Sequence, residues 1–375
     1  MLLTQDQKMI RDAVRAFAQE ELWPHAAQWD RDHTFPRQAH KGLAALGCYG
    51  ICVPEEYGGA GLDYLTLSLV LEEIAAGDGG TSTAISVTNC PYNAILMKYG
   101  TQAQKQQWLV PAARGDILGA FCLTEPHAGS DASAVRTTAT REGGEYALNG
   151  VKQFITSGQN GQAAIVIAVT DKNAGKKGLS AFIVPTSNPG WKVAGLERKL
   201  GQHSSDTAQI LLQDCRIPGQ NRIGEEGEGY KIALSALEGG RIGIASQSVG
   251  MARSALEFAI RYAKEREAFG VPIFEHQAVA FRLADCATRL EAARQLIWHA
   301  AALRDAGQPC LKEAAMAKLF ASEAAEHVCS TAIQTLGGYG VTADFPVERI
   351  YRDVRVCQIY EGTSDVQKII ISRAL

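Results

Sequence analysis

The chain has 375 residues, of which 46% are hydrophobic and 21% charged, and its formal net charge is −3 at pH 7. This is the composition of a globular protein, and the balanced charge gives no reason to expect binding to nucleic acid or to an anionic membrane. Because this length exceeds what one core usually supports, we expect two or three packed units.

Cysteine usage and the N-terminal sequence bear on the compartment. The nine cysteines form no C-x-x-C pair and their number is odd, so we expect reduced, mostly buried thiols of an intracellular protein. No apolar run approaches transmembrane length, and the first residues lead into helical pattern without a signal peptide. We therefore expect a cytoplasmic bacterial protein, or a mitochondrial matrix protein if a presequence has been removed.

The first part of the chain has the pattern of a helical domain. Capping boxes occur at Thr4-Gln5-Asp6-Gln7 and Thr101-Gln102-Ala103-Gln104. Apolar residues recur at helical spacing over residues 41–46, 65–76 and 81–99. Pro91 is expected to break or kink the last of these helices. We therefore predict an N-terminal helical domain over residues 1–117.

The apolar pattern then changes to short runs separated by Gly, Pro, Asn and Asp. These runs cover residues 120–123, 135–141, 146–148, 163–169, 179–184 and 210–212. Such a pattern is typical of a meandering antiparallel sheet. We predict a middle antiparallel β domain over residues 118–228, whose strand pattern closes at Arg216-Ile217-Pro218.

The remaining residues, 229–375, return to helical pattern. Proline is absent from residues 219–271, 273–308 and 310–345. Such stretches favour helices longer than average, packed as a bundle, with breaks at the intervening Gly-Pro segments and near Gly337. The predicted fold is mostly α with a β insert.

Several common chemistries lack their motifs. No Gly-x-Gly-x-x-Gly follows a predicted strand, and the Gly-x-Ser-x-Gly and P-loop patterns are absent. The segment Glu323-Ala324-Ala325-Glu326-His327 approaches a zinc-binding helix, but its first position is Glu where His is required. A solvated helix face is the better interpretation.

A candidate catalytic carboxylate lies near the C-terminus, in Gln358-Ile359-Tyr360-Glu361-Gly362-Thr363-Ser364-Asp365-Val366-Gln367. A carboxyl held among apolar side chains has a raised pKa and can act as a base near neutral pH. Alternatively, the stretch is a turn followed by a helix that Thr363 or Ser364 caps, and Glu361 is a solvated charge. These residues alone favour the second interpretation.

Two segments of the β domain are candidate ligand loops. Phe121-Cys122-Leu123-Thr124-Glu125-Pro126-His127-Ala128-Gly129-Ser130-Asp131 offers small residues and hydroxyls after a strand, a setting that exposes N–H groups to a phosphate or a flavin edge. In Lys152-Gln153-Phe154-Ile155-Thr156-Ser157-Gly158, the ring of Phe154 and the hydroxyl of Thr156 fall on one face of a strand. Each segment singly is more often an ordinary turn or a packed strand.

Taken together, six ordered motifs resemble the acyl-CoA dehydrogenase family over nearly the whole chain. They are the loop ending at Ser130-Asp131, Phe154-Ile155-Thr156, Glu238-Gly239-Gly240-Arg241, Arg266-Glu267-Ala268-Phe269-Gly270, Gln334-Thr335-Leu336-Gly337-Gly338 and Tyr360-Glu361-Gly362-Thr363. Residues 241–247 and 312–319 are most similar to the short-chain (butyryl-CoA) branch.

The resemblance implies the three-domain fold of that family, with a C-terminal four-helix bundle, a homotetramer built as a dimer of dimers, and FAD bound between subunits. Thr124 and Thr156 match positions that hydrogen-bond the flavin ring, and Phe154 matches one that packs on it. Arg266 and Gln277 would reach the adenine-diphosphate half from a neighbouring subunit. The other implied FAD-binding residues are Phe121, Leu123, Gly129, Ser130, Ile155, Phe269, Gln334, Leu336, Gly337, Gly338, Thr363 and Asp365.

The resemblance also assigns the chemistry. Glu361 matches the catalytic base, and its N–H donates to the developing enolate oxygen while the β-hydrogen leaves as hydride to the flavin. The product is a trans-2-enoyl-CoA, made from a short-chain, straight or branched acyl-CoA, and the electrons pass to electron-transfer flavoprotein. The implied substrate-binding residues are Ser130, Glu238, Arg241, Tyr360 and Gly362.

Some positions depart from the family pattern. His127 replaces a small residue, Phe154 stands where many members have Trp, and Ala268 stands where several have a hydroxyl. Gly240 occupies the position from which some relatives supply the base, which strengthens the assignment to Glu361. The alternatives are an acyl-CoA oxidase on the same fold, which the compact length disfavours, and a catalytically silent flavoprotein or helical scaffold, which the retained Glu361 disfavours.

Overall fold

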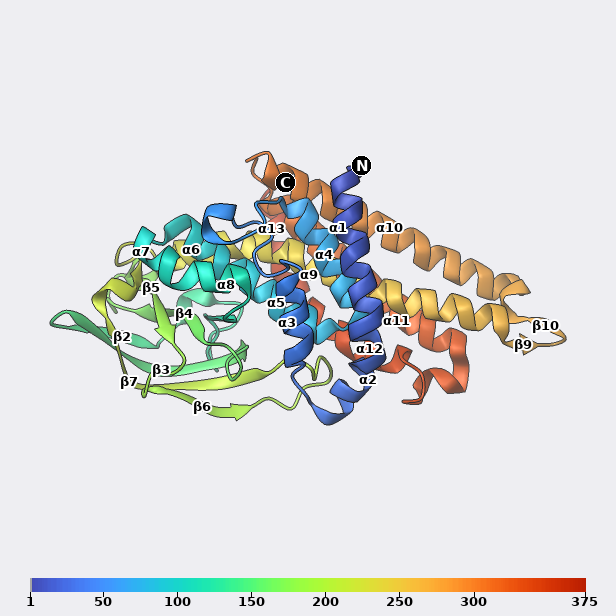
Figure 1. The fold of residues 1–375 in the computed structure, drawn as a ribbon, viewed down its shortest axis with the longest axis horizontal. Helices are drawn as coiled ribbons and strands as arrows, with labels where there is room; N and C mark the ends of the chain where they lie inside the picture. The colour runs from blue at the N-terminus through green and yellow to red at the C-terminus, as the bar shows by residue number, and fades with distance from the viewer. Residues whose placement is uncertain (1) are drawn as a thin grey trace.

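A computed structural model describes residues 2–375. The strands of the large sheet gather at one end of the molecule, and the long helices α9, α10 and α11 extend toward the other end, with the start of α9 packed against the sheet (Figure 1). Both chain termini are at the same edge of the molecule in this view (Figure 1). The arrangement is mostly helical with a sheet-forming middle segment, as predicted.

The N-terminal region is helical throughout, and both predicted capping boxes are confirmed. Thr4 and Thr101 each accept a backbone N–H from a glutamine three residues on, whose side chain accepts the N–H of the capping residue. The helices are α1 (Gln5–Phe17), α2 (Trp23–Asp32), α3 (Arg37–Ala45), α4 (Tyr64–Gly77), α5 (Gly79–Val87), α6 (Ala94–Tyr99), α7 (Gln102–Gln104) and α8 (Val110–Arg114), with π-helical turns at Ala18–Leu22, Thr88–Asn93 and Lys105–Leu109 and a 3₁₀ turn at Glu55–Tyr57.

The predicted break at Pro91 is confirmed. The helical path from α5 to α6 is interrupted at Cys90, whose φ of −152° and ψ of 117° are those of extended backbone. A proline ring has no N–H and clashes with the preceding helical turn, which explains why the helix cannot continue through this point.

Helix α4 is buried on nearly all sides, because it packs against α1 on one side and against α9 and α10 on the other. Asp63 caps it, accepting the N–H of Thr66 at 2.7 Å. Leu65, Leu69 and Ala75 of α4 belong to the same core cluster as the long C-terminal helices. The N-terminal region thus supplies one wall of the C-terminal bundle.

The middle region is one sheet with the strand order β6-β7-β3-β2-β4-β5-β8, and β1 pairs with β4 at its side. Most neighbours are antiparallel as predicted, but β1–β4 and β2–β4 are parallel. The strands are β1 (Gly119–Cys122), β2 (Thr138–Glu142), β3 (Glu145–Thr156), β4 (Ala163–Val169), β5 (Leu179–Pro185), β6 (Trp191–Leu196), β7 (Thr207–Pro218) and β8 (Arg222–Ile223), with 3₁₀ turns at Ala132–Ala134, Gly175–Gly178 and Gly219–Asn221.

The C-terminal region holds three long helices of 37, 29 and 26 residues, which confirms the prediction from the missing prolines. They are α9 (Gly229–Glu265), α10 (Gln277–Asp305) and α11 (Leu311–Leu336), followed by α12 (Val347–Val354) and α13 (Ser364–Ser372). A short hairpin, β9 (Glu267–Ala268) and β10 (Val271–Pro272), and a 3₁₀ turn at Ile273–Glu275 join α9 to α10; further 3₁₀ turns are Gly337–Val341 and Arg355–Gln358.

Two expectations from composition can be compared with the structure. All nine cysteines are free thiols, and all but Cys52 are buried. Within residues 2–375, none of the helices has the length and apolarity needed to cross a bilayer.

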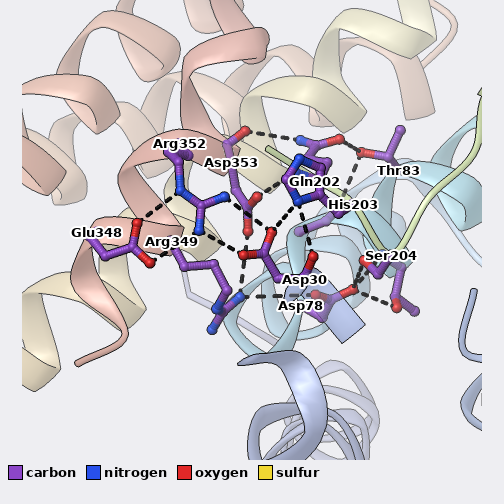
Figure 2. A network of polar contacts seen from close by, with 12 residues as sticks. Asp30, Asp78, Thr83, Gln202, His203, Ser204, Glu348, Arg349, Arg352 and Asp353 are labelled. Atoms are coloured by element: carbon purple, nitrogen blue, oxygen red, sulfur yellow. Dashed lines mark hydrogen bonds and ion pairs between the residues drawn. The ribbon is translucent and has the colours of Figure 1, made fainter. Parts of the chain in front are cut away.

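A polar network of buried and partly buried side chains joins the three regions of the chain (Figure 2). Arg352 of α12 binds Asp30 of α2, with Nη2 at 2.6 Å from Oδ2. Ser204, in the segment between β6 and β7, donates its hydroxyl to Asp78 at 2.6 Å. Because each pair links different regions, the network fixes how the sheet and the two helical regions are placed around the site described next.

Candidate active site

Glu361 lies in the turn between the 3₁₀ segment Arg355–Gln358 and α13, and its backbone is in the left-handed region with φ of 57°. Gly362 follows with φ of 92°. Thr363 then caps α13 by accepting the N–H of Val366 at 3.3 Å, so the predicted cap is confirmed. A non-glycine residue with positive φ is uncommon outside strained or functional positions.

The carboxylate of Glu361 points into the protein and is not a solvated surface charge. Its Oε2 is buried and has no hydrogen-bond partner among residues 2–375. A Cβ built on Gly240 of α9 would lie 2.6 Å from that atom. Burial raises the pKa of Glu361 to about 7, although Arg241 and Lys318 oppose the rise. A group with this pKa exchanges a proton readily near neutral pH.

Two donors that the sequence analysis missed fix the turn beside this carboxylate. The Nζ of Lys318 in α11 donates to the carbonyl oxygen of Gly362 at 2.6 Å. The Nε2 of Gln367 in α13 donates to the same oxygen at 2.7 Å and to that of Glu361 at 3.3 Å. Since no local pattern marks a lysine on a distant helix, only the tertiary structure reveals this contact.

Tyr360 connects the turn to the network between the regions. Its hydroxyl donates to Oε1 of Gln247 at 3.0 Å, and Nε2 of Gln247 donates to Thr83 at 3.2 Å. The Thr83 hydroxyl donates to Gln202 at 2.7 Å, and the N–H of Gln202 donates to Asp353 (Figure 2). Burial raises the pKa of Asp353 to about 6. The hydroxyl of Tyr360 thus faces this interior chain of hydrogen bonds.

The predicted substrate residues on α9 lie near Glu361. Arg241 is buried, its Nε and Nη1 have no partner within residues 2–375, and both Glu361 and Glu238 attract it. Glu238 is instead engaged by Arg304 of α10, with Nη1 at 2.8 Å from its Oε1, and by the thiol of Cys310 at 3.3 Å. Of the two, Arg241 therefore has the free polar atoms for a ligand.

In the sheet, two predicted flavin segments lie side by side. The N–H of Gln153 donates to the carbonyl of Thr124 at 2.9 Å, which joins the end of β1 to β3. A register shift in β3 and a φ of 59° turn Phe154 outward, and the residue is 61% exposed. Ile155 points into the core and is 1% exposed, while Thr156 is partly exposed. Leu123 is buried in a different core cluster from Ile155, and the partly buried Phe121 packs against the cluster that contains Leu123.

The loop after β1 is supported by a buried ion pair. Glu125 accepts the N–H groups of Arg136 at 2.8 Å and Thr137 at 3.0 Å. It also binds Lys152 of β3 at 2.7 Å. His127 lies with Nε2 at 3.5 Å from the same carboxylate. This arrangement leaves the tip of the loop exposed to solvent, where the predicted ligand residues are Gly129 and Ser130.

Most of the remaining predicted FAD residues form a second group near the end of α9 and the end of α11. Arg266, Leu336, Gly337 and Gly338 line one surface groove together with Tyr262, a residue in the last turn of α9. Phe269, at the tip of the β9–β10 hairpin, is 97% exposed with φ of 55°. Gln277 and Gln334 are exposed nearby in the chain, and Thr363 and Asp365 lie instead beside Glu361 at the start of α13. The hairpin and the sheet are at opposite ends of the molecule (Figure 1).

The exposed groups fit a flavin dinucleotide. A Cβ built on Gly129, Gly337 or Gly338 would meet nothing within 4 Å, so these backbones are open to a ligand. Arg266 is exposed and has no ion-pair partner within residues 2–375, as a phosphate-binding cation requires. The exposed ring of Phe154 offers a stacking surface. Within one chain, Phe154 and Gly129 of the sheet region lie far from Arg266 and the hairpin at the other end of the molecule (Figure 1).

Family comparisons agree with this architecture. The N-terminal domain of acyl-CoA dehydrogenases matches residues 4–116, the middle domain matches residues 120–215, and the C-terminal domain matches residues 227–375. The chain therefore belongs to the acyl-CoA dehydrogenase family.

Individual relatives are similar over almost the full length. The chain is 48% identical to the mitochondrial short-chain specific acyl-CoA dehydrogenase of Rattus norvegicus, covering 99% of this chain and 90% of the relative. It is 40% identical to butyryl-CoA dehydrogenase from Megasphaera elsdenii, with a TM-score of 0.98 and coverage of 100% and 99%. A chain of a structure described as electron transferring flavoprotein of Acidaminococcus fermentans is 46% identical, with a TM-score of 0.98 and coverage of 100% and 98%.

Proposed function

We propose that this chain is an FAD-dependent short-chain acyl-CoA dehydrogenase that converts a straight or branched short-chain acyl-CoA to the trans-2-enoyl-CoA. Electrons then pass to an electron-transfer flavoprotein. The observation that carries the proposal is the buried carboxylate of Glu361, whose Oε2 has no hydrogen-bond partner among residues 2–375. Burial raises the pKa of this group to about 7.

Glu361 is the base in this proposal. A proton α to a thioester is very weakly acidic, so its removal needs a desolvated carboxylate together with a donor for the developing enolate oxygen. The backbone N–H of Glu361 makes no hydrogen bond to the described residues 2–375 and is available as that donor. The carboxylate then holds the α-proton at Oε2 or Oε1, with Arg241 nearby as a compensating charge.

The chain's own residues would hold the cofactor in two groups. Phe154, Thr124 and Thr156 would hold the flavin ring, and Arg266 and Gly338 would hold the diphosphate half of a dinucleotide bound by a second copy. FAD, when bound, supplies the acceptor for the β-hydrogen, which leaves as hydride. Orientation between the α-carbon and Glu361 is the protein's main contribution, because misplaced reacting groups are costly.

The similar proteins support the substrate class. The relatives named above are a short-chain specific acyl-CoA dehydrogenase and a butyryl-CoA dehydrogenase, and another similar chain comes from a structure described as electron transferring flavoprotein. Solved structures described with FAD or FADH2 are also similar. The buried Glu361 disfavours a catalytically silent scaffold, and an oxidase would differ in reacting rapidly with oxygen after flavin reduction.

The test is Glu361→Gln, with anaerobic single-turnover flavin reduction by butyryl-CoA as the measurement. The amide keeps the shape but does not accept the proton, so the rate should fall about 100- to 10,000-fold, with FAD content unchanged. Glu323→Gln, at an exposed position of α11, is the matched control and should behave as wild type.

The same measurement has a predicted pH dependence. Glu361 must be ionised to accept the proton, so the wild-type rate should rise as the pH increases through about 7. Near wild-type flavin reduction by Glu361→Gln would show that another group is the base.

A further inference from the structure

We propose that Lys318 is a positioning residue that clamps the turn carrying Glu361 and supplies a positive charge facing its carboxylate. The proposal rests on the proposed function of Glu361 as base, and concerns how the protein holds that base. Lys318 lies in α11, far from the turn in sequence.

The burial of Lys318 requires an explanation. Its side chain is 0% exposed, and an ammonium group taken out of water is costly unless it is paired. Lys152, the other fully buried lysine within residues 2–375, has Glu125 at 2.7 Å. Among residues 2–375, no carboxylate lies within ion-pair distance of the Lys318 ammonium group. The one hydrogen bond of this side chain goes to the carbonyl oxygen of Gly362.

That carbonyl belongs to the strained part of the turn. Glu361 and Gly362 have φ of 57° and 92°, and a left-handed non-glycine residue persists only where its surroundings fix it. Lys318 from α11 and Gln367 from α13 hold the same oxygen from two helices. The direction of the Glu361 side chain therefore depends on this double contact.

The charge of Lys318 also acts on Glu361. The titratable groups close enough to interact electrostatically with the carboxylate are Arg241 of α9, Lys318 of α11 and the Cys90 thiol of the π-helical turn. Only the first two are cationic. Burial lowers the pKa of Lys318 to about 8, and the attractions of Cys357 and Glu361 oppose that fall. Lys318 thus remains a cation near neutral pH, where the base must ionise.

The experiment compares Lys318→Met, which removes the charge and the donor, with Lys318→Arg, which keeps the charge. Flavin reduction by butyryl-CoA is followed across pH. An infrared titration of the protonated Glu361 carboxyl, identified as the band missing from Glu361→Gln, reports the same ionisation without turnover. Removing an opposite charge nearby should move both midpoints up by about one pH unit in Lys318→Met. Lys318→Arg should stay near wild type.

Lys199→Met is the matched control. Lys199 is also largely desolvated, with a pKa lowered to about 8, and donates to a backbone carbonyl, that of Ser205, but faces Asp206 and Asp353 instead of Glu361. Its midpoints should equal those of wild type. If Lys318→Met fails to fold, Lys318→Gln carries the same test, because it keeps an N–H donor without the charge.

A loss of rate by the same factor at every pH, with an unchanged infrared midpoint, would overturn the proposal and leave Lys318 only a structural role. If the wild-type enzyme reduces no flavin with any acyl-CoA, the proposed function fails, but the infrared midpoints still test the effect of Lys318 on Glu361.

Discussion

At the scale of single residues, the carboxylate of Glu361 occupies the space that a side chain at position 240 would otherwise fill. A Cβ on Gly240 would lie 2.6 Å from Oε2 and 2.9 Å from Cδ and Oε1 of Glu361, so any other residue there would displace the carboxylate. The absence of a side chain on α9 leaves the space that the carboxylate occupies. Two carboxylates cannot share that space, because like charges in a desolvated site are strongly unfavourable.

We therefore predict that a glutamate at position 240 can supply the catalytic carboxylate when Glu361 is replaced by glycine. Gly240→Glu alone should abolish flavin reduction by butyryl-CoA, since its carboxylate collides with Glu361. The double variant Glu361→Gly with Gly240→Glu should recover measurable reduction, but less than wild type, because its carboxylate approaches the α-carbon along a different line. The control is Glu361→Gly with Gly240→Gln, which has the same bulk without the base. Equal rates in the two double variants would contradict the prediction.

At the scale of elements, the pair of β1 and β3 depends on a charge buried between them. Lys152 of β3 binds Glu125 at 2.7 Å and also donates to the carbonyls of Leu123 at 3.2 Å and Ile167 at 2.7 Å. The lysine therefore ties β3 to both the loop after β1 and strand β4. These contacts of Lys152 fix the base of that loop and so limit the movement of its exposed tip.

Glu125→Gln should destabilise the protein strongly. It leaves the ammonium group of Lys152 buried without a counter-charge, and breaking a buried pair typically costs about 3–5 kcal/mol. Denaturant unfolding measures the loss, and FAD content should fall with it because the loop loosens. Glu125→Gln with Lys152→Met should be less destabilised than Glu125→Gln alone, whereas Glu145→Gln, exposed at the start of β3, should be neutral. A double variant no better than the single one would contradict this account.

Features of helices and strands that depend on local sequence are predicted correctly, whereas those that depend on distant contacts are not. The two capping boxes and the break at Pro91 are local chemistry, and all three are confirmed. Strand β6 was missed because only Trp191 of its six residues is buried, so apolar and polar residues do not alternate. The parallel pairing of β1 with β4 was missed because pairing between distant strands leaves no local pattern.

The same limit applies to the site. Glu361 was predicted from its motif, but its backbone conformation and its contact with Gly240 arise only when α9 and the C-terminal turn come together. Lys318 and Gln247 lie in ordinary helical pattern, and their contacts to this turn and to Tyr360 are entirely tertiary. The assigned cofactor roles of the remaining residues stay predictions.

At the scale of the whole molecule, the two groups of candidate FAD residues lie at opposite ends of one chain (Figure 1). Phe154 and Thr156 belong to the sheet, while Arg266 and Phe269 belong to the hairpin beyond α9. We therefore predict that a complete FAD site combines the sheet of one copy with the hairpin of a second copy. A homotetramer arranged as a dimer of dimers would provide such sites.

Subunit mixing tests this arrangement. Arg266→Ala should have low FAD occupancy, because it removes a charge-assisted contact worth about 1.5–3 kcal/mol, and Glu361→Gln should lack the base. In an oligomer of the two variants, one kind of site combines the intact Glu361 of one chain with the intact Arg266 of the other. Differently tagged copies should therefore yield mixed oligomers with more activity at limiting FAD than either variant alone.

The matched control mixes Glu361→Gln with a doubly substituted chain carrying Glu361→Gln and Arg266→Ala, in which no site regains the base. This mixture should show no recovery. If the first mixture also shows none, although purified mixed oligomers contain both chains, then Arg266 does not complete a neighbour's site. In that case the hairpin serves another contact, and the flavin is held by residues of a single chain.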